Sequence, residues 1–191
     1  MQSDYYIIMP ENHFAERAAA REAARRRERL WAALQLGGWL ILCYAASGVG
    51  ALATRDAATF YSQLSLPSWA PSSSVFGPVW TVLYALMAVS AWMVWREREE
   101  DPDNSAIKPA LQLFGVQLAV NALWSWVFFR WHLGALSVLT IIVLIALVST
   151  VAVRFYRIRQ AAGVLLVPYI AWLAYAGCLA LVAWRRNPGV L

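Results

Sequence analysis

Three regularly spaced aromatic residues are the first feature of this sequence that could bind a ligand. The stretch VFGPVWTVLY, residues 75–84, places Phe76, Trp80 and Tyr84 four residues apart. Side chains four residues apart lie on one face of a helix, so this stretch predicts an aromatic stripe. Such a stripe commonly packs helices together, and it can also stack against a flat apolar ligand. Both interpretations stay open on this stretch alone.

Polar residues with the same spacing follow in residues 109–129. Gln117, Asn121 and Ser125 form a stripe in an otherwise apolar stretch, and Trp124 lies beside it. Amide groups inside a membrane need hydrogen-bond partners. The stripe is therefore predicted to face the interior of a helix bundle.

A third stretch, residues 161–184, carries Trp172 on one face with Tyr175 and Ala176. Together, the three stretches offer aromatic walls and a few neutral hydrogen-bonding groups. This combination suits a large, flat, mostly apolar ligand that stacks on Trp and Tyr and is oriented by amide, hydroxyl or indole groups. Anionic tails of such a ligand would lie near the loops and Arg55.

Two small residues suggest a second role for the polar stretch. Gly115 and Ala119 lie four residues apart. At about 100° per residue they lie roughly 140° around the helix from Asn121. One face of this helix is thus predicted to line a pocket, while the other meets a neighbouring helix or a second subunit.

The acidic residues and histidines exclude several kinds of chemistry. Of eleven Asp and Glu residues the last is Asp103, and none lies in a long apolar stretch. The histidines are His13 and His132, and Cys43 and Cys178 both lie in apolar surroundings. We therefore expect no buried carboxylate relay, no metal site, no required cofactor and no ordinary acid–base catalysis.

The composition indicates the elements that position these residues. The chain is 61% hydrophobic and 14% charged, against about 25% charged in soluble domains. A spanning helix needs about 20 apolar residues, and five stretches supply them, at about 30–54, 76–95, 109–129, 134–153 and 161–184. We predict an all-α integral membrane protein with a five-helix domain over residues 30–187. Residues 1–29 and 188–191 are its tails.

Basic residues predict the orientation and argue against nucleic acid. Twelve Arg and Lys residues would lie on the side of the N-terminus and four on the opposite side. This places the N-terminus inside and the C-terminus outside. Because the basic residues lie between apolar stretches, we expect a lipid bilayer and no nucleic acid as partner. The Arg-rich residues 14–29 predict a helix that continues into the first span or lies on an anionic lipid surface.

Three motifs in order resemble one known family. They are LPSWAP at residues 66–71 followed by VFGPVWTVLYALM at 75–87, QLAVNALWSWVFF at 117–129, and AAGVLLVPYIAWLAYA at 161–176. The chain resembles the tryptophan-rich sensory protein family, also called the translocator protein, TspO/MBR or peripheral-type benzodiazepine receptor family. The similarity covers roughly residues 35–187.

The resemblance implies a function as well as a fold. It implies a five-helix bundle, commonly a homodimer, that binds porphyrins such as protoporphyrin IX, with sterols as further ligands. The positions that match pocket residues of the family are Phe76, Trp80, Tyr84, Asn121, Trp124, Trp172 and Ala176, with Tyr175 in place of a phenylalanine. The resemblance favours a porphyrin-binding receptor or sensor. The alternatives are light- and oxygen-dependent porphyrin degradation through Trp80 and Trp172, and transport of sterols or tetrapyrroles.

Four positions depart from the family pattern. Ala180 replaces an asparagine in the last helix, and Val138 lies near the place of an acidic residue in the fourth. Arg130 replaces a glycine, and Ser72 replaces a proline. Losing the asparagine and the acid makes the interior more apolar, and we expect this to affect ligand preference.

Overall fold

The structure is a computed structural model that describes residues 12–191, with side chains from residue 16 onwards. All the elements in this range are helical, which confirms the expected fold class for the described residues. They are α1 (Asn12–Ala53), α2 (Ala57–Gln63), η1 (Ser73–Val75), α3 (Phe76–Glu100), α4 (Ile107–Ser125), η2 (Trp126–Arg130), α5 (Gly134–Ile158), α6 (Gln160–Val164) and α7 (Val167–Arg186).

The chain divides into two units, residues 1–37 and residues 38–191. In the first unit, the helix expected over residues 14–29 is present as part of α1, and the side chains of residues 16–29 are exposed. Alanine and arginine are strong helix formers, which explains why so polar a segment is helical. The first eleven residues of the expected basic tail and the side chain of His13 lie outside the described part of the chain.

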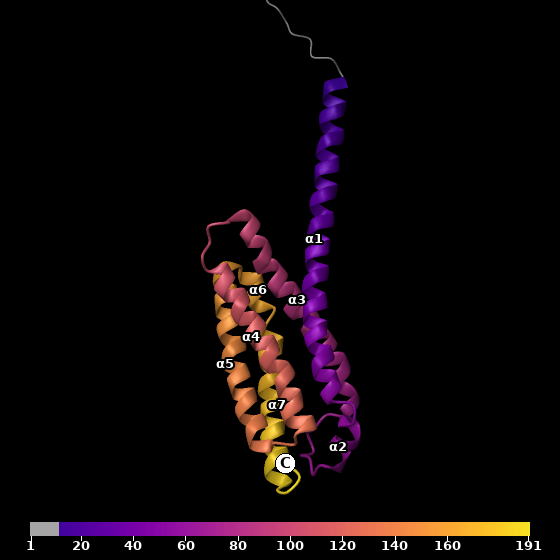
Figure 1. The fold of residues 1–191 in the computed structure, drawn as a ribbon, viewed down its shortest axis with the longest axis vertical. Helices are drawn as coiled ribbons and strands as arrows, with labels where there is room; N and C mark the ends of the chain where they lie inside the picture. The colour runs from indigo at the N-terminus through magenta and orange to yellow at the C-terminus, as the bar shows by residue number, and fades with distance from the viewer. Residues whose placement is uncertain (1–11) are drawn as a thin grey trace, which may run out of the picture. The chain divides into compact units, whose positions relative to one another are not determined.

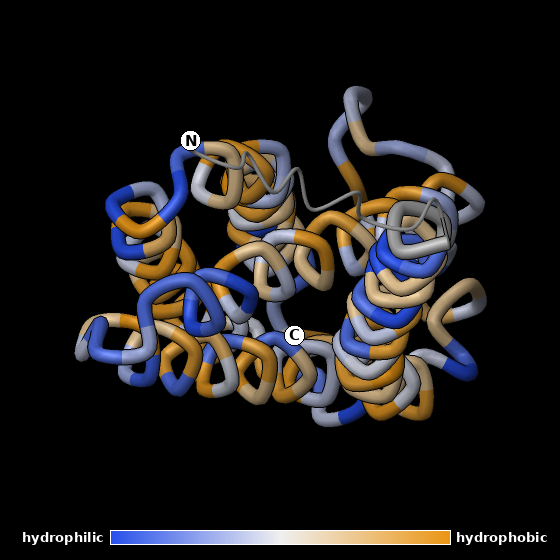
Figure 2. Tube along the Cα trace, turned by 90° about the horizontal axis from the view of Figure 1, so that it is seen from above, coloured by the Kyte–Doolittle hydropathy of each residue, from blue (hydrophilic) through white to orange (hydrophobic). Residues whose placement is uncertain are grey.

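Within residues 12–191, five helical segments are long and apolar enough to cross a membrane. They are Glu16–Ala53, Ser73–Glu100, Ile107–Arg130, Gly134–Ile158 and Gln160–Arg186. Large apolar side chains such as Ile41, Leu139 and Ile142 are more than half exposed, as expected where lipid replaces water around the bundle. The chain is an integral, multi-pass membrane protein. Hydrophobic residues dominate the helices in Figure 2.

Within the second unit, α5 packs between α4 and α7, and these three helices run side by side in Figure 1. Their contacts bury large apolar side chains, among them Phe114, Leu144, Phe155 and Leu173. Packing of this kind, rather than water exclusion, holds helices together in a bilayer. It provides the rigid wall on which the polar stripe of α4 is presented.

The last span is broken between α6 and α7, just before Pro168. Proline has no N–H for the helix ladder, and its ring disturbs the preceding turn. The hydroxyl of Ser90 on α3 donates to the backbone oxygen of Ala162 at 2.7 Å. This buried bond occupies a carbonyl of α6 beside the break, as a membrane interior requires.

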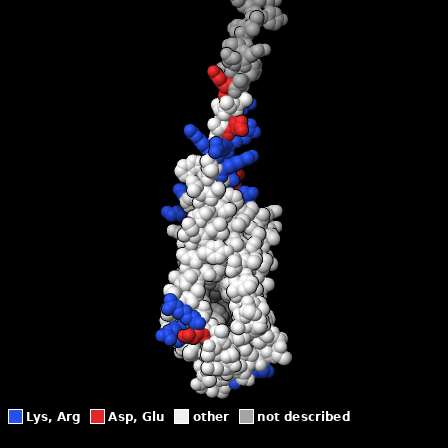
Figure 3. All heavy atoms as spheres, turned by 90° about the vertical axis from the view of Figure 1, so that its right-hand side faces the viewer, with Lys and Arg blue, Asp and Glu red and all other residues white. Residues whose placement is uncertain are grey.

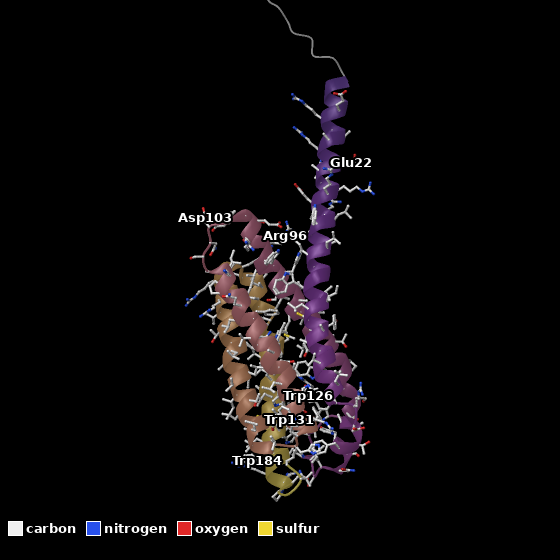
Figure 4. The ribbon with its side chains drawn as sticks, viewed as in Figure 1. Glu22, Arg96, Asp103, Trp126, Trp131 and Trp184 are labelled. Carbon is white, nitrogen blue, oxygen red and sulfur yellow. The ribbon has the colours of Figure 1, made fainter. Side chains whose placement is uncertain are left out.

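The two ends of the second unit differ in side-chain type. Trp126, Trp131 and Trp184 lie at the end that carries the C-terminus, whereas Arg96 and Asp103 lie at the other end (Figure 4). Tryptophan favours the membrane interface because its ring is apolar and its N–H is polar. The Trp-rich end therefore fits one membrane surface, and it is the end at which the site is found.

Candidate ligand-binding site

A cavity of about 610 Å³ lies among the ends of α1, α3, α4 and α7 and the loop that contains α2. Its lining residues are Ser47, Gly50, Ala51, Thr54, Ala57, Ala58, Tyr61, Ser73, Ser74, Phe76, Gly77, Trp80, Thr81, Tyr84, Asn121, Trp124, Ser125, Phe129, Trp172 and Ala176. None of these residues carries a formal charge. A hollow opens on the face drawn in Figure 3, with charged side chains at its edge.

Aromatic rings form much of the cavity wall. The stripe on α3 places Trp80 against Tyr84, with ring centroids 5.6 Å apart. Phe76 meets Trp172 of α7 edge to face at 5.9 Å. On α4, Trp124 is held in place because its Nε1 donates to the backbone oxygen of Ser137 at 3.1 Å. The wall therefore offers ring faces whose orientation is already set in the absence of a ligand.

A chain of hydrogen bonds between neutral groups lies behind the cavity. The hydroxyl of Tyr84 donates to Asn121 Oδ1, and Asn121 Nδ2 donates to the hydroxyl of Tyr169 at 2.7 Å. Tyr169 in turn donates to Gln117 Oε1 at 3.3 Å. Asn121, Gln117 and Tyr169 are all almost fully buried. The stripe of amides on α4 thus faces the interior, as its spacing predicted, and each amide there has a partner.

One polar atom on the wall has no such partner. The indole Nε1 of Trp172 is buried and makes no hydrogen bond within the described residues. Buried N–H groups are rarely left without an acceptor. In the lining of this cavity, the N–H can donate to a ligand that presents a carbonyl, carboxylate or ring nitrogen.

The side of the cavity formed by α1 is built from small residues. Gly50 lies so close to α4 that a Cβ on it would be 3.1 Å from Ser125 Oγ. Two side-chain bonds attach this part of α1, because Tyr44 donates to the Thr81 oxygen at 3.0 Å and Trp126 Nε1 donates to the Val49 oxygen at 3.1 Å. A Cβ at position 50 would require the Ser125 side chain to shift by a few tenths of an ångström.

Comparison with known proteins identifies the family with this architecture. A model of the TspO/MBR family matches residues 39–185. Protein CrtK of Rhodobacter capsulatus is 34% identical over 151 residues, which cover 79% of this chain and 91% of the relative. Tryptophan-rich sensory protein of Cereibacter sphaeroides is 34% identical over 149 residues, covering 78% and 89%. Translocator protein of Homo sapiens is 32% identical over 130 residues, covering 68% and 76%.

The chain belongs to the TspO/MBR family. This confirms the resemblance inferred from the three motifs, and the cavity lies among the helices that carry those motifs. The names of two of these relatives describe a sensory protein and a translocator, and those descriptions apply to the relatives themselves.

The structure brings together most of the residues that the sequence singled out. Seven of the eight expected ligand-binding residues line the cavity, namely Phe76, Trp80, Tyr84, Asn121, Trp124, Trp172 and Ala176. Tyr175 is not among the lining residues. Its ring lies 5.5 Å from that of Trp172, and its hydroxyl donates to the backbone oxygen of Trp69 at 3.0 Å. Gly115 and Ala119 are exposed on the outer side of α4.

Several lining residues were not anticipated from the sequence. Ser47 and Ala51 lie four residues apart on one face of α1, which is a signal that could have been noticed, and Thr54 directly follows the end of that helix. Ala57 and Tyr61 come from α2, a short helix in a loop for which no helix was predicted. Tyr169 is the centre of the hydrogen-bond chain, but its sequence position marks it only as an aromatic residue near Pro168.

Two departures from the TspO/MBR pattern lie away from the cavity wall. Ala180 is buried on α7, and neither it nor Val138 on α5 is among the lining residues. The apolar replacements therefore act on the packing of α5 and α7. They leave the polar groups at the wall to Asn121, the indoles and the small hydroxyl residues.

Proposed function

We propose that this TspO/MBR protein is a membrane receptor that binds a porphyrin, of the protoporphyrin IX type, in its aromatic cavity. The observation that carries the proposal is an uncharged cavity of about 610 Å³ with rings from three helices and one buried indole N–H without a partner. Sites for small molecules and cofactors typically have volumes of about 300–1,000 Å³ and few, well-placed polar groups.

The chemistry of a porphyrin matches the groups on the wall. A large flat π-system stacks on Trp80, Trp172 and Phe76, whose rings meet the cavity from α3 and α7. Aromatic pairs contribute about 0.5–1.5 kcal/mol beyond the burial of their area. Carboxylate tails would extend toward the loop, where Arg55 directly follows the lining residue Thr54. No charged group is needed inside the cavity.

Quenching of tryptophan fluorescence tests the proposal. Purified protein is titrated with protoporphyrin IX, and we expect saturable quenching. The double variant Trp80→Phe, Trp172→Phe should bind at least tenfold more weakly, because two stacking faces and one donor are altered. The matched control is Trp131→Phe, since Trp131 is half exposed and does not line the cavity. Unchanged affinity in the double variant would contradict the assignment of this cavity as the porphyrin-binding site.

Two further arms separate the alternatives. In a panel of protoporphyrin IX, haem, a bilin and cholesterol, the aromatic cavity should favour the tetrapyrroles, and a clear preference for cholesterol would assign a sterol function instead. Illumination of the porphyrin complex tests degradation. Bleaching faster than that of free porphyrin, and slowed by Trp80→Phe, would assign photo-oxidative breakdown in addition to binding.

A further inference from the structure

The loop between α1 and α3, residues 54–75, covers one side of the cavity. Six of its residues, Thr54, Ala57, Ala58, Tyr61, Ser73 and Ser74, belong to the lining. In Figure 1, α2 lies at the same end of the second unit as the end of α7. Whatever holds this loop in place therefore controls one wall of the cavity.

Asn187, immediately after α7, makes a two-point contact with the middle of this loop. Its Oδ1 accepts from the backbone N–H of Ser65 at 2.8 Å, and its Nδ2 donates to the Ser65 oxygen at 3.3 Å. The same Nδ2 also donates to the Ala183 oxygen of α7 at 2.7 Å. One side-chain amide thus pairs with both backbone groups of one residue, as a neighbouring strand would.

Among the residues that make polar contacts between the end of α7 and the loop, Asn187 is also the most deeply buried. Its side chain is only 9% exposed. Arg186 donates to the Leu66 oxygen at 3.1 Å and Tyr175 to the Trp69 oxygen at 3.0 Å, but both of those bonds are exposed and single. The two bonds between Asn187 and Ser65 are partly buried and therefore better shielded from water than these exposed bonds, so loss of Asn187 leaves the larger deficit.

The α2 half of the loop rests on apolar contacts instead. The ring of Phe60 stacks on His132 with centroids 4.1 Å apart and meets Phe128 at 6.1 Å. These contacts hold α2 against the end of α4. Residues 64–72 have no comparable ring stack on the bundle apart from Trp69 against Tyr175, so Asn187 is the principal polar anchor of this second half.

We infer that Asn187 is a positioning residue that holds the 54–75 loop over the cavity and thereby slows ligand release. The inference rests on the proposed binding function. Neither Asn187 nor Ser65 lines the cavity, so changing Asn187 loosens the covering loop without removing any wall group. The effect should appear in the dissociation rate much more than in the spectrum of the bound ligand.

Dissociation kinetics provide the first test. Protein loaded with protoporphyrin IX is mixed with an excess of albumin as a trap, and recovery of tryptophan fluorescence gives the off-rate. Asn187→Ala removes both hydrogen bonds to Ser65, as well as the bond to the Ala183 oxygen, so we expect an off-rate raised by about tenfold or more. The conservative variant Asn187→Asp keeps the acceptor for the Ser65 N–H, so its off-rate should lie between those of the wild type and Asn187→Ala.

A matched control comes from the other loop. The Oδ1 of Asn104 accepts from the backbone N–H of Ala106 at 3.1 Å, and Asn104 does not line the cavity. Asn104→Ala therefore removes an asparagine contact to backbone in the α3–α4 loop. The off-rate of this variant should equal that of the wild type.

Hydrogen exchange of the ligand-free protein provides a second readout. Peptides covering residues 57–75 should exchange faster in Asn187→Ala, while peptides from α4 and α5 exchange as in the wild type, which also shows that the variant is folded. The inference is overturned if the wild type binds porphyrin but Asn187→Ala has an unchanged off-rate and unchanged hydrogen exchange. The proposed function would still stand in that case. If the wild type binds no porphyrin, the proposed function fails, and the exchange data still report whether Asn187 holds the loop.

Discussion

Asn121 shows how fully the few polar groups of this interior are used. Its Oδ1 accepts from Tyr84 and its Nδ2 donates to Tyr169, so one side chain joins α3, α4 and α7. The amide has a second N–H and a second lone pair, which remain available at the cavity wall. A single residue therefore joins three helices and also presents polar groups to the cavity proposed as the ligand site.

Replacing Asn121 by alanine should destabilise the ligand-free protein. The hydroxyls of Tyr84 and Tyr169 would each lose a partner in a buried environment, which costs about 1–3 kcal/mol in total. Thermal unfolding in detergent measures the change. Thr150→Ala is a suitable control, because the Thr150 hydroxyl bonds only to its own helix, at the Ala146 oxygen. Equal melting temperatures for the two variants would contradict the role given to the hydrogen-bond chain.

Tyr61 introduces a dependence on alkaline pH. Burial raises the pKa of its phenol above the ordinary value, and neighbouring Tyr175 raises it further. The folded state therefore holds the phenol proton more tightly than the unfolded state does. The tighter proton binding stabilises the folded state. This stabilisation is fully present below the pKa of the phenol in the unfolded state, about 10, and is lost as pH rises through the higher pKa in the folded state. Ionisation also removes the donor that Tyr61 offers to the Pro71 oxygen at 3.0 Å.

The difference in melting temperature between the wild type and Tyr61→Phe measures this effect. We expect the difference to be constant near neutral pH. Above pH of about 10 the wild type should lose stability faster than the variant. A difference that stays constant through the alkaline range would show that Tyr61 ionises equally well in the folded and unfolded states.

At the scale of elements, α4 presents two faces with different surroundings. One face carries Gln117 and Asn121 into the bundle, and the other leaves Gly115 and Ala119 exposed. A Cβ on Gly115 would meet no atom within 4 Å. The homodimer predicted through this small-residue face can thus be tested without disturbing the subunit.

Gly115→Leu should shift the protein from dimer to monomer while its melting temperature changes little. The added side chain fits the isolated subunit but prevents close approach of two helices at this position. Light scattering coupled to gel filtration measures the mass of the protein after subtraction of detergent. The control is Val143→Leu, on the exposed face of α5. A Gly115→Leu variant with the same mass as the wild type would place any dimer contact elsewhere.

The end of α4 also illustrates a change of helix type within one element. The backbone N–H of Trp131 bonds to the Trp126 oxygen at 2.9 Å, five residues back, which is a π-helical turn. His132 follows with a φ of 53°, a conformation that is uncommon for residues other than glycine. This irregular end places the His132 ring on Phe60 and so supports the loop over the cavity.

For the whole molecule, orientation in the membrane remains a prediction from charge. The basic residues place the N-terminus inside and the C-terminus outside, so the cavity and its covering loop would lie toward the outer surface. Labelling of single cysteines introduced at positions 20 and 190, in a background with Cys43→Ala and Cys178→Ala, tests this in intact cells. An impermeant maleimide should label position 190 and not position 20, and the reverse pattern would invert the topology.

The five spans, the family and most of the aromatic residues of the cavity wall could be predicted from the sequence. Those properties depend on local chemistry: the length of an apolar stretch decides whether it crosses a bilayer, and helical spacing decides which side chains share a face. Phe76, Trp80 and Tyr84 lie on one face in any helix that contains them. For the same reason, the inward stripe of Gln117 and Asn121 was predictable.

Which of these groups meet, and how the loop covers the cavity, depends on tertiary packing. Asn187 and Ser65 are 122 positions apart, and Asn121 and Tyr169 are 48 apart. Nothing in the spacing of either member predicts the other, because such contacts depend on the packing of α5 against α7 and on the path of a loop. The sequence therefore supplied most of the aromatic wall, while packing supplied the partners of Gln117 and Asn121, left the Trp172 N–H without a partner and held the loop over the cavity.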